Sequence, residues 1–124
     1  MTSVKPKLDA SERAARDLLN RKVREGIIDR RSANEVLKVG LPFVRHMLAT
    51  WRREGTDPQW ITGKFQAIHA EALQRQAAAA GAVAQRMALT RVMCAELYLA
   101  VWAGLQEDYA AFVNERRSRP SLPA

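Results

Sequence analysis

The chain has little of what most enzymes and secreted domains depend on. It holds one cysteine and two histidines among 124 residues, so an internal disulfide is impossible and no ligand set has the spacing of a zinc site. The single thiol, Cys94, fits a reducing compartment. A Gly-rich phosphate-binding loop and a paired-carboxylate motif are also missing. We therefore expect no enzyme activity, no cofactor, no metal and no small-molecule substrate, and we expect a cytoplasmic location.

Long hydrophobic runs and period-two alternation are absent as well. The N-terminus lacks the apolar run of a signal peptide, and the most apolar stretch, residues 92–105, is too short for a membrane span and contains Glu96. Aromatic residues make up only 6% of the chain, whereas alanine is abundant, which favours helices over strands. The sequence predicts a single all-α domain, residues 1–124, without a membrane partner and with flexible tails at 1–8 and 118–124.

Helix start and stop residues divide the first half of the chain. Residues 9–12 form a capping box that opens a helix ending near residue 25. Residues 32–35 form a second capping box, which predicts a short helix closed by Gly40. Pro42 then either stops that helix or starts the next one, which extends from about residue 42 to residue 54. We expect these N-terminal helices to be short and basic, in a fold of four to five helices.

Two longer helices are predicted in the second half. Asp57 and Pro58 are a strong helix-start signal, since the first caps and the second occupies a position that needs no amide donor. The helix that follows reaches Gly81, which is either a kink or a turn. Residues 82–117 then form the final helix. Whether they make a hairpin or a kinked rod, these two helices should carry the core.

The final helix has more apolar surface than the first half of the chain can cover. One stripe repeats at a spacing of four, and further large side chains such as Trp102 lie elsewhere on the cylinder. Leaving two or three of them exposed would favour association. We therefore predict a homodimer, or docking on another helical protein, through this interface: Leu89, Met93, Leu97, Val101, Trp102, Leu105 and Tyr109.

The net charge of +7 and a pI near 10.3 indicate an anionic partner or simply an arginine-rich base composition. Residues 32–54 look like a helix-turn-helix, and the tail at 51–55 (WRREG) resembles transposase-like segments of that kind. The alternative is an ordinary helix corner solvated by arginines. The outer face of its second helix has no carboxylate. The predicted contacts to duplex DNA are Lys38, Arg45, His46, Arg52 and Arg53.

Two binding functions follow from these patterns. The first is a non-enzymatic nucleic-acid-binding accessory or regulatory protein, acting as a dimer through the segment at 32–54. The alternative is a helical adaptor or scaffold that binds a protein partner through its long C-terminal helices. Glu96, alone within the apolar helix, is either a partly exposed residue or one half of a buried ion pair that fixes helix register.

Overall fold

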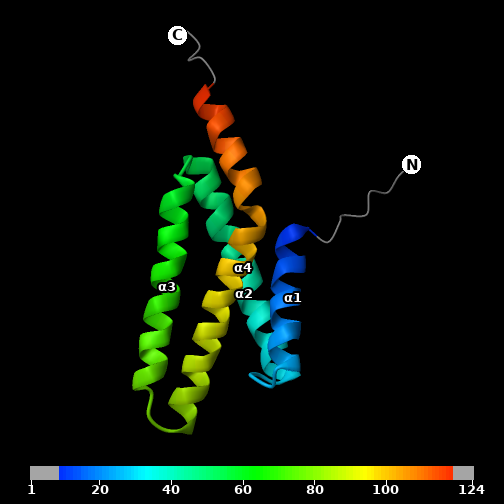
Figure 1. Ribbon diagram of the computed structural model, residues 1–124, viewed down its shortest axis with the longest axis vertical. Coiled ribbons are helices and arrows are strands. Elements are labelled where there is room, and N and C mark those ends of the chain that lie inside the picture. The colour runs from blue at the N-terminus through cyan, green and yellow to red at the C-terminus, as the bar shows by residue number, and fades with distance from the viewer. Residues whose placement is uncertain (1–8, 119–124) are drawn as a thin grey trace, which may run out of the picture.

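A computed structural model describes residues 9–118, which form four helices and no strand. The helices are α1 (Ala10–Arg24), α2 (Arg30–Glu54), α3 (Pro58–Ala78) and α4 (Ala82–Ser118), as Figure 1 shows. The prediction of an all-α fold is confirmed. The tails expected at 1–8 and 118–124 lie outside the described residues, except for Ser118, which is the last residue of α4.

An aspartate caps each of the first three helices. The side chains of Asp9, Asp29 and Asp57 accept backbone N–H groups of the first turn, which otherwise have no partner. The capping box predicted at residues 32–35 is wrong. Asp29 starts α2 three residues earlier, and the backbone N–H of Ser32 is the donor to its carboxylate, at 2.7 Å.

The turn predicted at Gly40 and Pro42 is also wrong, because α2 continues through both for 25 residues. An ideal Cβ at Gly40 would lie 3.4 Å from the Leu97 side chain, so this glycine allows a close approach of α2 to α4 and does not end the helix. Pro42 is exposed and removes one backbone donor. The neighbouring Leu41 and Val44 are buried, and their packing keeps the helix intact.

The chain turns sharply between α3 and α4. α3 ends at Ala78, and Gly81 adopts a positive φ of 90° just before α4 begins, a backbone conformation that side chains disfavour. The two helices then run back along each other as a hairpin (Figure 1).

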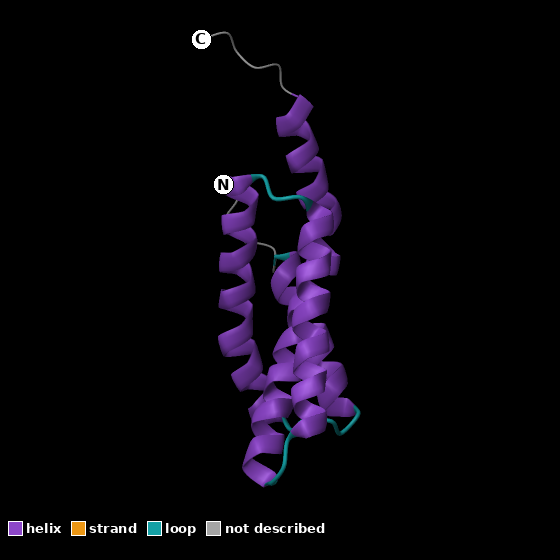
Figure 2. Cartoon of the chain, turned by 90° about the vertical axis from the view of Figure 1, so that its left-hand side faces the viewer, coloured by secondary structure: helices purple, strands orange, loops and turns teal. Residues whose placement is uncertain are grey.

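α4 is the central helix of the molecule. It packs against α1, α2 and α3, and α1 also packs on α2, as the two views in Figures 1 and 2 show. Within residues 9–118, the backbones of α2 and α3 do not pack directly on each other. The apolar residues of all four helices form one core cluster around α4.

The apolar stripe of α4 lies inside the chain. Five of the seven residues predicted as an association interface are buried, and Leu89 and Leu105 are partly buried against the core. The buried five are Met93, Leu97, Val101, Trp102 and Tyr109. The reason is the length of α2: as one helix it supplies a continuous apolar face, including Val36 and Val44, that two short helices would not. The stripe is therefore not a free surface of this chain.

Length and composition alone would allow α4 to cross a membrane. Residues 82–117 contain an 18-residue window with a mean hydropathy of 1.3. The core helix of a soluble protein passes the same test, and α4 has three helices packed around it. Length and hydropathy therefore do not distinguish a membrane span from a buried core helix.

Glu96 links three helices through one carboxylate. Its Oε1 lies 3.0 Å from Nζ of Lys22 on α1, and its Oε2 lies 3.6 Å from Nε2 of His69 on α3. All three side chains are partly buried. The buried Nε2 of His69 has no hydrogen-bond partner within residues 9–118. Glu96 is therefore partly exposed, as the first of the two expectations has it, and it also forms an ion pair that orders α1 and α3 against α4.

Replacing Pro42 tests the continuity of α2. Pro42→Ala restores a backbone donor within a helix, so the free energy of unfolding should rise by about 1–3 kcal/mol. Urea unfolding followed by circular dichroism measures this change. If residues 40–42 formed a turn with Pro42 at the first helical position, the substitution would be neutral or destabilising, and Pro58→Ala, at the first position of α3, provides that comparison.

Candidate interaction surfaces

Most of the aromatic side chains form one network. All three tryptophans, both tyrosines and two of the three phenylalanines take part. Adjacent ring centroids lie 5.2–6.4 Å apart, the range in which aromatic pairs attract each other. The contacts run from Phe43 through Tyr98, Phe65 and Trp51 to Trp60, with a branch from Phe65 through Trp102 to Tyr109. Side chains therefore span the gap between α2 and α3 that the backbones leave.

The network has a buried end and an exposed end. Phe65 and Trp102 are fully enclosed, and the Trp102 indole donates a hydrogen bond to Oγ1 of Thr62 at 2.8 Å. At the other end Phe43 is 49% exposed and Trp60 is 51% exposed. The buried rings hold the outer ones in place, so the exposed rings present a rigid apolar surface.

We define the aromatic surface as Val39, Phe43, Trp60 and Tyr98. Val39 and Phe43 lie one turn apart on α2, and Tyr98 of α4 contacts the Phe43 ring. Tyr98 also lines a groove of about 310 Å³ between α3 and α4, whose walls include Cys94. Burial raises the pKa of Tyr98 to about 12 and raises that of the Cys94 thiol, so both are neutral at pH 7 and the groove floor carries no charge.

Positive charge lies near this surface. Lys38 and Lys64 are exposed on α2 and α3, and Arg91 lines the groove. None of the three makes an ion pair with another residue in the range 9–118. Glu71, on the same groove, lies 3.9 Å from Arg75. Within the described residues, three cations without ion pairs, Lys38, Lys64 and Arg91, therefore lie around the aromatic surface, together with the exposed carboxylates of Glu35 and Asp57.

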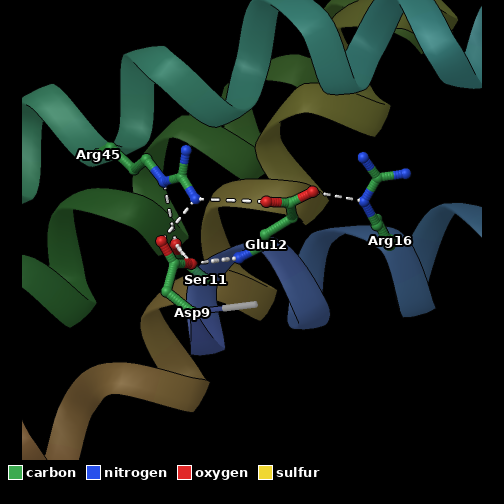
Figure 3. Close-up of polar contacts among 5 residues, drawn as sticks. All are labelled: Asp9, Ser11, Glu12, Arg16 and Arg45. Atoms are coloured by element: carbon green, nitrogen blue, oxygen red, sulfur yellow. Dashed lines mark hydrogen bonds and ion pairs between the residues drawn. The ribbon is translucent and has the colours of Figure 1, made fainter. Parts of the chain in front are cut away.

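Arg45, predicted to contact nucleic acid, is engaged within the chain (Figure 3). Its Nη2 lies 2.6 Å from Oδ2 of Asp9 and 3.8 Å from Oε1 of Glu12, and its Nε donates to Oγ of Ser11 at 3.1 Å. These contacts fasten the start of α1 to the middle of α2. The hydroxyl of Ser11, the amide of Glu12 and then Arg45 lower the pKa of Asp9 to about 2.

The two arginines at the end of α2 hold different positions. The Arg52 guanidinium lies over the Phe112 ring at 4.0 Å, a cation–π contact. Arg53 donates to Oγ1 of Thr50 at 3.3 Å. Nη1 of Arg116 donates to the backbone carbonyls of Arg52 and Arg53, so α4 caps the C-terminal end of α2. Both α2 arginines remain exposed.

The five residues predicted as DNA contacts share the exposed side of α2. Lys38, Arg45 and Arg52 are spaced by seven, with His46 and Arg53 beside them, and we call these five the α2 basic stripe. No carboxylate falls between positions 38 and 53. The helix-turn-helix interpretation fails because the motif needs two helices at a turn, and α2 is one helix.

A spacing of four in Val39, Phe43, Met47 and Trp51 was the sequence signal for the aromatic surface, but it is also typical of a core face.

A cavity of about 410 Å³ lies between α2 and α4. Its charged residues are Arg45, Arg52 and Asp108, of which Arg45 is paired with Asp9. The charges balance, and nothing about this cavity indicates a particular ligand. In the part of the chain described, no group of three or more His, Cys, Asp or Glu residues is placed to hold a metal ion.

Comparison with protein-family models, with curated proteins and with solved structures found no match for this chain. The function is therefore inferred from the surfaces of the chain itself.

The Asp9 contacts should make stability depend on pH in acid. Asp9 has a lower pKa folded, about 2, than unfolded, about 3.9, so its contribution is complete above about pH 4 and is lost as the pH falls toward 2. Because its carboxylate is 56% exposed, we expect Asp9→Ala to lower the free energy of unfolding by only about 1 kcal/mol at pH 7.

Urea unfolding of the wild type and of Asp9→Ala at pH 7 and at pH 2.5 measures this difference, which should shrink at the lower pH. Asp17→Ala is the control, since Asp17 is exposed on the same helix and makes no ion pair within residues 9–118. A difference that stays constant with pH would show that the Asp9 carboxylate is not what stabilises the start of α1.

Proposed function

We propose that the protein is a non-enzymatic helical adaptor that binds an amphipathic helix of a protein partner on its aromatic surface. The observation that carries this proposal is the pair of half-exposed rings, Phe43 on α2 and Trp60 on α3, which are joined through further rings of the same network. The joining rings are Tyr98, Phe65 and Trp51, of which Phe65 is fully buried. Rigid aromatic anchors of this kind are enriched where proteins bind one another.

The arrangement of the helices fits a helical partner. The backbones of α2 and α3 do not pack on each other. Tyr98 of α4 lies between the two helices, where its ring contacts Phe43 of α2 and Phe65 of α3. A partner helix laid over the exposed rings would pack side chains spaced by three and four against Phe43 and Trp60, as ridges of one helix pack on another. α3, with 21 residues, is about 30 Å long, enough to contact several turns of such a helix.

The charges near the aromatic surface specify the flanks of the partner helix. Lys38, Lys64 and Arg91 are exposed and unpaired within the described residues. Acidic residues beside the apolar positions of the partner would complement them, which increases both selectivity and the rate of association. We therefore infer an acidic amphipathic helix as the bound segment.

A second candidate function is nucleic-acid binding through the α2 basic stripe. It is favoured by the absence of carboxylates between positions 38 and 53. Without a helix-turn-helix, the stripe would contact phosphates along one helix face, with little reading of base sequence. Lys38 and Arg53 are the best placed, since Arg45 is held by Asp9 and Arg52 lies over Phe112.

A designed peptide tests the adaptor proposal directly. The probe is a helix of about 18 residues with leucine at i, i+3, i+4 and i+7 and glutamate on its flanks. Binding should change tryptophan fluorescence, because Trp60 is half exposed. Phe43→Ser should weaken binding by about tenfold or more, as expected for an aromatic hot spot, and the same peptide with lysine flanks should bind less well.

Val83→Ser is the matched control, because Val83 is also an exposed apolar residue but lies on the α3–α4 turn, away from the aromatic surface. Equal binding of the glutamate peptide by wild type and Phe43→Ser would refute the proposal. Light scattering on the same proteins separates self-association: a dimer that is lost in Phe43→Ser would identify a second copy of the chain, not another protein, as the occupant.

The salt dependence of duplex binding tests the second candidate. Replacing Lys38 and Arg53 together by alanine should reduce the slope of log K against log salt by about two units if both contact phosphate. The measurement is fluorescence anisotropy of a labelled DNA duplex over a series of salt concentrations. An unchanged slope, or no binding by the wild type at low salt, removes this candidate without affecting the adaptor.

A further inference from the structure

Exposed apolar side chains also gather at one end of the molecule. Ile27, Leu73, Val83 and Met87 are four of the seven large apolar residues that are exposed within residues 9–118, and the other three belong to the aromatic surface. These four lie on or near the α1–α2 and α3–α4 turns, which occupy the same lower end in Figures 1 and 2. We call this region, residues 21–31 together with 71–87, the turn end.

The α3–α4 hairpin tip carries no charge. Residues 76–85 contain only alanine, glycine, valine and glutamine, and Val83 is 69% exposed. Most of the alanines in this stretch are exposed too. An exposed stretch of this length without charge is typical of a contact with a protein partner or a membrane.

Arginines stand directly behind the uncharged tip. Arg75 and Arg86 are the first charged residues on either side of it. The turn end exposes six arginines against three carboxylates, Glu25, Asp29 and Glu71. The six are Arg21, Arg24, Arg30, Arg31, Arg75 and Arg86.

The two turns lie close enough to act together. The pKa of Asp29 is lowered chiefly by the backbone amide of Ser32, and it is lowered further by Arg31 and by Arg86. Arg86 belongs to α4, whereas Asp29 precedes α2, so the arginines of both turns contribute to one positive region. Figure 1 shows the α3–α4 turn extending beyond the α1–α2 turn.

We propose that the turn end binds the surface of an anionic phospholipid bilayer. The apolar tip enters the boundary between headgroups and acyl chains, where Val83 and the exposed alanines leave water, and Met87 lies one turn behind Val83, at the level of Arg86. The arginines behind it contact headgroup phosphates, with their aliphatic stems along the apolar layer. The order in the protein, apolar at the tip and basic behind it, matches the order of the layers in a bilayer. A nucleic acid would offer phosphates to the arginines but no apolar layer for the tip.

Flotation with lipid vesicles tests this proposal. The probes are vesicles of phosphatidylcholine alone and vesicles in which half of the lipid is phosphatidylglycerol. The wild type should float with the anionic vesicles and much less with the neutral ones, because the arginines need a negative surface. The variant Val83→Ser with Met87→Ser should bind the anionic vesicles about tenfold less tightly, and Arg30→Gln with Arg31→Gln should also weaken binding.

The control is a double serine variant of the aromatic surface, Val39→Ser with Phe43→Ser. It should float with the anionic vesicles as the wild type does. These positions are exposed, and circular dichroism confirms that each variant keeps its helices. Failure of the wild type to float, or equal flotation of Val83→Ser/Met87→Ser, overturns the proposal. Loss of flotation in the control also overturns it. None of these results depends on the adaptor function, which is tested separately by peptide binding to the wild type and to Phe43→Ser.

Discussion

The fold depends on the burial of α4 by the three other helices. Leu97, Val101 and Trp102 of α4 are almost completely enclosed, and each such side chain contributes roughly 1.5–3 kcal/mol when it leaves water. Three separate helices are required, since α4 is apolar on most sides. α2 and α3 consequently pack on different sides of α4 and not on each other. The gap between their backbones, which aromatic side chains bridge, is a direct result of this constraint.

The sequence was sufficient for the fold class and for several helix ends. Asp9 and Asp57 were recognised as caps because a cap uses only local geometry, and the stretch after Gly81 was recognised by its unbroken period. Gly40 and Pro42 were misread because their usual local effect is to end a helix. Gly40 is instead needed where α2 meets Leu97, a contact between residues 57 positions apart in the chain. Local patterns cannot show such a requirement.

The same limit applies to the candidate site. Periodicity identified the apolar face of α4 but not the helix that covers it, so Leu97 and Val101 were placed at an interface when they are core. Phe43 has the same spacing signal as buried residues of α2, yet it lies half exposed beside Tyr98. The basic residues of α2 were correctly placed on its outer face, but the partner of Arg45, Asp9, lies on another helix. Pairings between helices decide which charges remain available.

The two proposed surfaces are connected by α3. Trp60 stands near its start and Leu73 near its end, 13 residues and therefore about 20 Å apart along the helix. Because the tip at residues 76–85 lies beyond Leu73, a helix bound near Trp60 would lie farther than this from a bilayer bound at the turn end. Since α3 packs along α4 throughout this length, the spacing is rigid. A protein partner with membrane affinity of its own would then bind more tightly at the bilayer than in solution, because the second contact becomes intramolecular. If both proposals hold, the chain would fix both the location of its partner and the height of that partner above the membrane.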